Sequence, residues 1–184
     1  PVVKRIYDEY FSKVKADAGW YGDPKAREPY FRARLRTVLG LPRDASILEV
    51  GCGVGDLLLF LRAEGFTNLR GIDMSEEQVS MGIQRGLNLI HGDVLQFLEG
   101  SPREGLDAII GINFIEHLRR EEVFSFLDLS FDRLRPGGWL FLQTVNGAGW
   151  LPGVLAWGDL THETIFTPQS LTSALNLAGF KEIL

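Results

Sequence analysis

The segment ILEVGCGVGD, residues 47–56, places three glycines within five positions directly after a run of β-forming residues. Glycine loses more conformational entropy on folding than any other residue, so three glycines at alternate positions require a reason. A residue without a Cβ atom can enter a tight turn and bring the backbone close to a bound molecule. The segment therefore predicts a buried strand followed by a turn. This turn either binds a ligand at the start of the next helix or is a tight turn without a ligand.

Short apolar runs alternate with helical patterns from residue 46 onward. The segments expected to form strands are 46–50, 68–74, 88–93, 106–113, 139–145 and, at the end of the sequence, 180–184. The segments expected to form helices are 56–65, 75–86, 93–100, 120–134 and 168–178. This alternation predicts an α/β fold, a Rossmann-like doubly wound and mostly parallel sheet with helices on both faces.

The first 45 residues carry aromatic-rich helical patterns, which predict an N-terminal helical cap (1–45) lying across the sheet of a Rossmann-like domain (46–184). The 184 residues are 45% hydrophobic and carry a net charge of −5, which is typical of a soluble globular protein and argues against a nucleic-acid partner. No segment is apolar enough to span a membrane, and the N-terminus is too polar for a signal peptide. A single cysteine excludes an internal disulfide framework. We expect a cytoplasmic protein.

Two acidic residues follow predicted strands at positions where such folds bind ligands, at the carboxyl ends of the strands. Asp73 ends the second predicted strand, where a carboxylate can accept both hydroxyls of a ribose. Asp93 ends the third, where it can meet an adenine amino group. The alternative roles are a helix cap or loop acid for Asp73 and an N-cap for Asp93. Together with the glycine turn, the two acids favour a nucleoside-like ligand.

The spacing and charge of the glycine turn separate two kinds of nucleoside ligand. Dinucleotide-binding turns usually have the pattern G-x-G-x-x-G, whereas this turn has G-x-G-x-G. Glu49 precedes the first glycine and Asp56 follows the last, and two carboxylates repel a pyrophosphate. The turn therefore favours a ligand that carries positive charge over NAD.

Five motifs in order resemble the class I S-adenosylmethionine-dependent methyltransferases. They are ILEVGCGVG, GIDMS, IHGDV, LDAIIGINFIEHL and LRPGGWLFLQT, and the resemblance covers about residues 45–184. It implies S-adenosyl-L-methionine as the cofactor and S-adenosyl-L-homocysteine as the product. It also implies that Gly51, Cys52 and Gly53 line the methionine portion of the cofactor while Glu49 supports the turn. The remaining expected cofactor contacts are Gly55, Asp73, Met74, Asp93, Val94, Ile112 and Asn113.

The acceptor is expected to bind against the long aromatic connection between the fifth strand and the last helix, since long loops of this kind are usually functional. The candidate wall residues are Trp20, Tyr21, Trp150, Trp157 and Phe166. His162 is the candidate general base, and the alternative is a loop histidine with a structural hydrogen bond. His117 lies in the sequence IEHL. Some relatives use the Glu-His pair of such a sequence, together with an earlier acidic residue, to hold a metal ion. Asn113 stands at that earlier position, so we expect no metal site.

The predicted function is methyl transfer from S-adenosylmethionine to an oxygen or nitrogen atom of a small-molecule acceptor, such as a sugar, a polysaccharide or a quinone-like compound. Two alternatives remain. One is a non-catalytic module that binds the cofactor, and the other is a nicotinamide-dependent oxidoreductase. Since the family fold ends with a seventh, antiparallel strand and the sequence ends before it, we expect that strand to be lacking. An open sheet edge can pair with another chain, which makes a homodimer an option.

Overall fold

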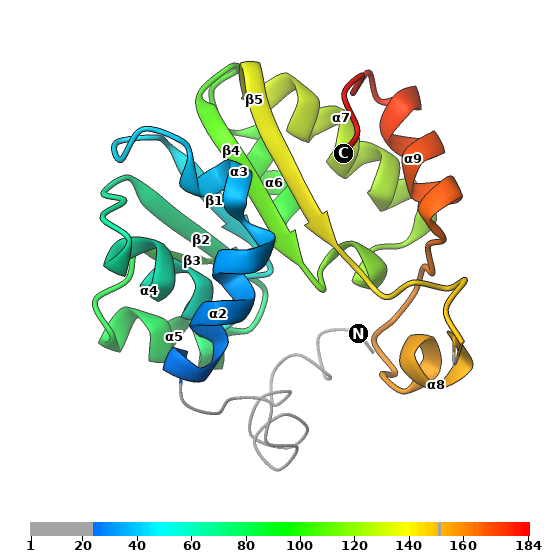
Figure 1. The fold of residues 1–184 in the computed structure, drawn as a ribbon, viewed down its shortest axis with the longest axis horizontal. Helices are drawn as coiled ribbons and strands as arrows, with labels where there is room; N and C mark the ends of the chain where they lie inside the picture. Colours follow the sequence, from blue (N-terminus) through cyan, green and yellow to red (C-terminus); the bar gives the residue numbers. More distant parts are fainter. Residues whose placement is uncertain (1–23, 151) are drawn as a thin grey trace.

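The computed structural model describes residues 24–150 and 152–184. Within them, five parallel strands form one sheet in the order β3-β2-β1-β4-β5 (Figure 1). The strands are β1 (Ile47–Val50), β2 (Leu69–Asp73), β3 (Leu89–His91), β4 (Leu106–Ile112) and β5 (Leu134–Gln143). The strand order reverses between β1 and β4, where doubly wound folds bind their ligands. The expected Rossmann-like α/β fold is confirmed.

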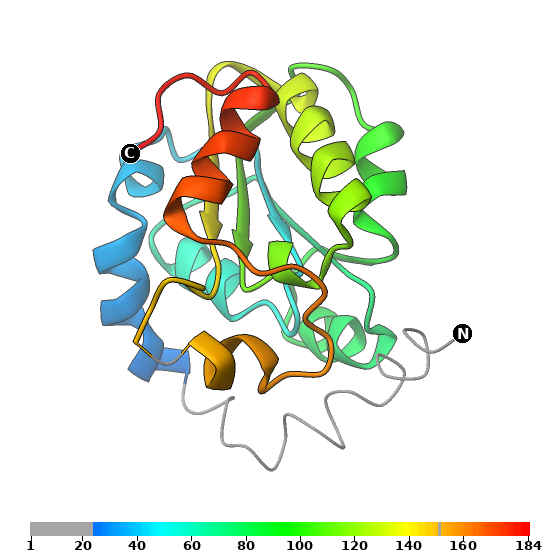
Figure 2. The same cartoon turned by 90° about the vertical axis from the view of Figure 1, so that its right-hand side faces the viewer.

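Helices cover both faces of the sheet (Figures 1 and 2). On the first face and its flank lie α2 (Pro24–Arg34), α3 (Arg36–Leu39), α4 (Asp56–Ala63) and α5 (Glu76–Gln84). On the second lie α6 (Val94–Glu99), α7 (Arg120–Arg133) and α9 (Pro168–Leu177). The short 3₁₀ helix η2 (Ile115–His117) follows β4, and α8 (Pro152–Trp157) stands apart below the sheet in Figure 2.

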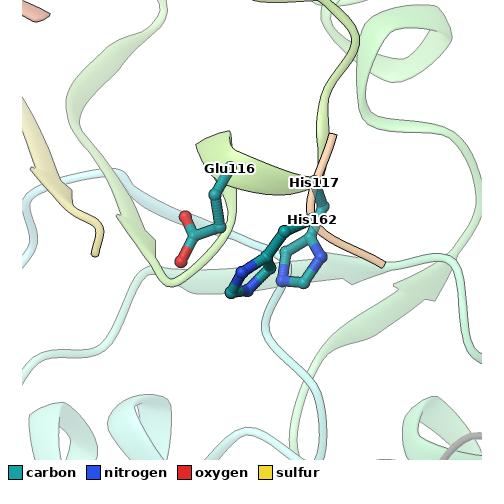
Figure 3. A group of neighbouring side chains, drawn as sticks. All are labelled: Glu116, His117 and His162. Carbon is teal, nitrogen blue, oxygen red and sulfur yellow. The ribbon is translucent and has the colours of Figure 1, made fainter. Parts of the chain in front are cut away.

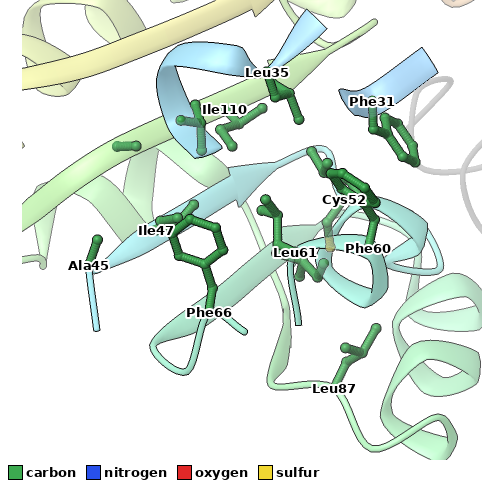
Figure 4. Packing of buried hydrophobic residues seen from close by; sticks show 14 of the residues in the cluster. Phe31, Leu35, Ala45, Ile47, Cys52, Phe60, Leu61, Phe66, Leu87 and Ile110 are labelled. Atoms are coloured by element: carbon green, nitrogen blue, oxygen red, sulfur yellow. The ribbon is translucent and has the colours of Figure 1, made fainter. Parts of the chain in front are cut away.

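Strand β1 alternates between the two hydrophobic cores. Ile47 packs with α2 and α4 in the first core, shown in Figure 4, whereas Leu48 and Val50 pack with α6 and α7 in the second. All three side chains are fully buried, and each such burial contributes about 1.5–3 kcal/mol relative to exposure. The same alternation directs Glu49 toward the side of α2 and α4.

Three predicted helix starts have capping side chains, of which two were expected as caps and the third, Asp93, had capping as its alternative role. Ser75 accepts a hydrogen bond from the backbone N–H of Gln78 at 3.4 Å, and Thr167 caps the helix that begins at Pro168. Asp93 also accepts from a backbone N–H, that of residue 96, at 2.9 Å. These caps satisfy backbone donors that a helix cannot pair internally.

The structure differs from the sequence-based expectation at two strands. Strand β5 begins at Leu134, five residues before the expected start, because Leu134 pairs with Leu106 before the chain bulges and resumes pairing at Trp139. Residues 180–184 form no strand, so the expected sixth strand is wrong. Phe180 instead packs against Phe131 of α7, with ring centroids 5.3 Å apart.

The described part of the expected N-terminal cap packs directly on the sheet domain. Phe31 of α2 lies against Phe60 of α4 with ring centroids 5.5 Å apart, and Leu35, which follows α2, is fully buried in the same core. Residues 1–23 of the expected cap lie outside the described residues. None of the described helices combines the length and the apolar composition needed to cross a membrane.

Candidate cofactor and acceptor site

The glycine turn between β1 and α4 has a backbone conformation that other residues rarely adopt. Gly51, Gly53 and Gly55 have φ angles of +64°, +53° and +79°. A Cβ atom on Gly51 would lie 2.8 Å from the Phe114 ring, and one on Gly55 would lie 2.3 Å from Leu87. These two glycines are therefore required by the backbone conformation and by packing within the protein, in addition to any ligand.

Asp73 ties the glycine turn to the end of β2. Its carboxylate accepts hydrogen bonds from the backbone N–H of Gly53 at 2.7 Å and of Ser75 at 2.8 Å. Burial raises the pKa of Asp73, and the two backbone donors oppose that shift. Since each carboxylate oxygen has a further lone pair, both can still accept a hydroxyl from a ligand. The structural role and the predicted ribose contact are therefore compatible.

Asp56 is neutralised within the protein. Its buried carboxylate pairs with Arg85 at 2.8 Å and with Arg27 of α2 at 3.2 Å. Arg85 also donates to the backbone carbonyl of Val54 at 3.1 Å. Asp56 therefore holds the turn between α2 and α5, and its charge is already compensated by two arginines when a ligand arrives.

Glu49 differs from Asp56 because part of its buried carboxyl group lacks a hydrogen-bond partner among the described residues. It is 5% exposed, and its Oε2 atom has no hydrogen-bond partner among the described residues. Burial raises the pKa of Glu49 well above its usual value, the charge of Asp73 adds to this shift, and Arg27 opposes it. A buried carboxyl group without a donor, beside a turn suited to a nucleoside, fits a ligand with cationic groups such as S-adenosylmethionine.

The other predicted cofactor residues lie at the carboxyl ends of β1, β2, β3 and β4, which share one edge of the sheet. Burial raises the pKa of the Cys52 thiol, so this thiol stays protonated and unreactive. Met74 is 42% exposed beyond β2. Asn113 is exposed beyond β4 with φ at +50°, a left-handed conformation in which asparagine is the commonest residue after glycine. Val94 is buried, while Asp93 and Ile112 are half-buried.

The predicted acceptor residues are not gathered into one wall. Trp150 and Trp157 are exposed, at 103% and 62%, on the segment around α8. Phe166 is buried in the second core, and its backbone bridges to Asn146. Trp20 and Tyr21 lie outside the described residues.

His162 lies on a loop that backbone hydrogen bonds attach to η2. The carbonyl oxygen of Glu116 accepts from the backbone N–H of Glu163 at 2.8 Å and of Thr164 at 3.0 Å. Within this loop the Nδ1 atom of His162 lies 2.6 Å from the carbonyl oxygen of Ala156. A carbonyl oxygen can only accept, so Nδ1 carries the proton and the lone pair is on Nε2.

These attachments bring His162 beside Glu116 and His117 (Figure 3). One ligand atom from each of the three side chains lies within 4.8 Å of the other two, and the imidazole centroids are 4.9 Å apart. Glu116 is 1% exposed, and neither of its carboxyl oxygens has a hydrogen-bond partner in the described structure. Burial raises the pKa of Glu116, and the nearby Thr144 and His162 oppose that shift.

No site role was predicted from the sequence for Glu116 or His117. Their signal was the Glu-His pair after the fourth predicted strand, but the pattern lacked an acid at Asn113. The structure supplies His162 instead, from a loop that sequence spacing does not relate to η2.

Comparison with known proteins identifies the family of the chain. The family model described as a methyltransferase domain matches residues 24–183. The ubiquinone biosynthesis O-methyltransferase of Brucella anthropi is 24% identical over 94% of this chain and 70% of its own length. Relatives of this name are matched over 35% to 70% of their length.

Solved structures share the fold. The S-adenosylmethionine-dependent methyltransferase of Archaeoglobus fulgidus superposes with a TM-score of 0.77 at 22% identity, over 95% of this chain and 73% of its own. Phosphoethanolamine N-methyltransferase 2 of Haemonchus contortus, solved with S-adenosylmethionine, has a TM-score of 0.70 at 14% identity over 94% of this chain and 44% of its own. The chain therefore belongs to the methyltransferase domain family and shares the fold of methyltransferases that depend on S-adenosylmethionine.

Proposed function

We propose that the protein transfers the methyl group of S-adenosylmethionine to a hydroxyl oxygen of a small, quinone-like aromatic acceptor. The observation that carries this proposal is that side chains able to accept a proton lie just after β4, next to the glycine turn that follows β1. Val50 at the end of β1 pairs with Gly111 near the end of β4, and Phe114 packs against Gly51. Glu116 follows two residues later, next to His162.

Oxygen is favoured over nitrogen for two reasons. A hydroxyl group must lose its proton when it is methylated, and groups able to accept that proton lie at this edge of the sheet. In addition, relatives matched over most of this chain are named as O-methyltransferases that act in ubiquinone biosynthesis. Both observations support a phenolic hydroxyl as the acceptor.

The bound cofactor supplies a sulfonium-activated methyl group, and the protein chiefly supplies proximity, alignment and exclusion of water. In this proposal Asp73 binds the ribose hydroxyls and Asp93 the adenine edge. The acid Glu49 faces the cationic part of the cofactor. Cys52 and Met74 pack beside it. The remaining contacts are Gly51, Gly53, Gly55, Val94, Ile112 and Asn113.

His162 is the proposed proton acceptor, because its Nε2 lone pair is available while Nδ1 donates to Ala156. Trp150 and Trp157 are the proposed aromatic surfaces for the acceptor ring. Their exposure is consistent with a segment that covers the acceptor only after it has bound.

Calorimetric titration tests the cofactor half of this proposal. S-adenosylhomocysteine is expected to bind the wild-type protein and to bind Asp73→Ala about 10–100-fold more weakly, because the variant loses charge-assisted hydrogen bonds. Asp128→Ala, which removes an exposed carboxylate from α7, is the matched control and keeps wild-type affinity. Equal affinities for all three proteins would contradict the assigned cofactor site.

Measurement of methyl transfer tests the acceptor half of this proposal. The protein is incubated with S-adenosylmethionine and a panel of catechols, phenols and aromatic amines, and the S-adenosylhomocysteine produced is measured. We expect product with hydroxylated acceptors and none with the amines. Cofactor binding without product from any acceptor would instead support the non-catalytic binding module.

A further inference from the structure

We propose that Glu116, His117 and His162 form a binding site for one divalent transition-metal ion, with Zn²⁺ as its simplest occupant. The site lies beyond β4, next to the expected position of the acceptor. Two imidazoles and one carboxylate are a common ligand set for such ions and leave coordination positions open for water or a substrate oxygen.

The hydrogen bonds of the two histidines hold the proton of each neutral ring on Nδ1. His117 Nδ1 lies 3.2 Å from the carbonyl oxygen of Thr161 and 2.8 Å from its hydroxyl, and the carbonyl can only accept. His162 Nδ1 faces the carbonyl of Ala156 in the same way. Both rings are therefore held in the tautomer in which Nε2 is the ligand atom.

A second layer of polar groups supports His117. The hydroxyl of Thr161 donates to Asp159 at 2.6 Å, which leaves its oxygen to accept from His117 Nδ1–H. Thr161 is only 7% exposed. A carboxylate that fixes a ligating histidine, directly or through a hydroxyl, is typical of metal sites, where it also increases the basicity of the ligand.

The buried carboxyl group of Glu116 is an independent observation that points to a cation. Both of its oxygens lack hydrogen-bond partners in the described structure. Thr144 lies nearby, but its hydroxyl also has no partner of acceptable geometry. A buried carboxylate without hydrogen bonds is strongly unfavourable unless a cation compensates its charge.

The dimensions suit one ion with a small adjustment. Ligand atoms bound to the same Zn²⁺ at about 2.1 Å lie about 3.4 Å apart in tetrahedral geometry. The three groups already have ligand atoms within 4.8 Å of one another. Since two of the ligands are imidazole nitrogens, we expect Zn²⁺ to bind more tightly than Mg²⁺, which prefers oxygen ligands.

The role of the ion in catalysis rests on the function proposed above, whereas its binding does not. A divalent ion lowers the pKa of a hydroxyl that coordinates it, so the acceptor proton leaves to solvent. The oxygen lone pair then forms the new O–CH₃ bond, and the electrons of the broken C–S bond return to sulfur. With an ion bound, His162 would be a ligand, and the charge of the ion would promote the loss of the proton that His162 accepts in the metal-free protein.

Titration of the chelator-treated full chain with Zn²⁺ tests the site. We expect one equivalent of Zn²⁺ to bind wild type, Zn²⁺ to bind more tightly than Mg²⁺, and His162→Gln and Glu116→Gln to bind about 100-fold more weakly. Thr161→Val, which removes the support of His117, should lose about 10-fold. His91→Gln is the control, because His91 lies at the end of β3 and faces the carbonyl of Met74.

Binding of S-adenosylhomocysteine is measured on every variant to show that the fold and cofactor site are intact. No Zn²⁺ binding to wild type, or equal binding to wild type, His162→Gln and Glu116→Gln, would overturn the metal site. If metal removal does not change the rate of methyl transfer, the catalytic role of the ion is refuted. His162 then remains the proposed base. Metal binding without turnover would refute the proposed reaction and leave the site standing.

Discussion

The carboxyl ends of β1 and β4 are neighbours in the sheet, but their acidic side chains are partnered in opposite ways. Beyond β1, Asp56 is neutralised by two arginines, and Asp73 of the adjacent β2 accepts two backbone amides. Beyond β4, both carboxyl oxygens of Glu116 lack hydrogen-bond partners in the described residues, and His162 reaches it from a distant loop.

Acidic side chains with internal partners stabilise the fold, whereas acidic side chains without such partners can bind a ligand. A buried polar group without a partner costs about 1–3 kcal/mol, so internal partners stabilise the glycine turn before the cofactor binds. Among the described residues, the carboxyl group of Glu116 has no such internal hydrogen bonds, and only a bound proton or cation compensates its charge. Glu49 resembles the second region in this respect, although it lies beside the first.

The largest effect is expected at the packed side of the glycine turn. Gly51→Ala should lower the free energy of unfolding by about 2–4 kcal/mol, because it combines a strained φ with displacement of Phe114. Urea denaturation measures the loss. Gly137→Ala is the matched control, since Gly137 also has a positive φ, +78°, but a Cβ atom there would meet no other atom within 4 Å. This control should lose about 1 kcal/mol. Equal losses would show that packing against Phe114 is unimportant.

The next largest effect on stability is expected at Asp56, whose charge is compensated by two arginines. Arg85→Ala should destabilise the fold by about 1–2 kcal/mol, because Asp56 stays buried and keeps only its longer contact with Arg27. Arg103→Ala removes an exposed pair with Asp132 and should change stability by less than about 0.5 kcal/mol. Thermal unfolding compares the two variants, and a neutral Arg85→Ala would mean that the pairing does not hold the turn.

A smaller effect is expected in the pH dependence of stability. Burial raises the pKa of Glu49, so the folded state keeps a proton that the unfolded chain releases as the pH rises past its ordinary value of 4.5. The contribution of Glu49 to the free energy of unfolding of the wild-type protein therefore decreases as the pH rises. The Glu49→Gln variant has no such decrease.

Denaturant unfolding of both proteins from about pH 4 to about pH 8 measures this difference. The stability of Glu49→Gln relative to wild type should increase with pH. Glu64→Gln is the control of opposite sign, because the hydrogen bond from Arg32 lowers the pKa of Glu64. A constant difference for Glu49→Gln would show that this carboxyl group is not shifted in the folded protein.

The smallest effect on stability is expected at the acceptor side. Trp150→Ala should change the free energy of unfolding by less than about 0.5 kcal/mol, because the side chain is fully exposed, yet kcat/KM for the acceptor should fall. Leu177→Ala, on the exposed side of α9, should alter neither quantity. An unchanged kcat/KM for Trp150→Ala would show that Trp150 is not one of the aromatic surfaces that bind the acceptor.

Local sequence patterns predicted most of the fold because their causes are local. The strand, glycine turn and helix of residues 47–56 follow from apolar alternation and from backbone conformations that glycine favours. The caps at Ser75 and Thr167 follow from side chains that satisfy backbone donors within one helical turn. The early start of β5 was missed because its first residue is separated from the rest of the strand by a bulge that only pairing with β4 reveals.

The sequence by itself determined the α/β class, the alternation of strand and helix segments along the chain, and the family that the glycine turn resembles. Each of these depends on residues that are close together in the chain. Only the tertiary structure decided which acids are compensated and which are not. Arg27 comes to Asp56 from another helix, and His162 comes to Glu116 through backbone hydrogen bonds between a loop and η2. The electrostatic state of a carboxylate depends on neighbours in space, and local sequence patterns do not encode those neighbours.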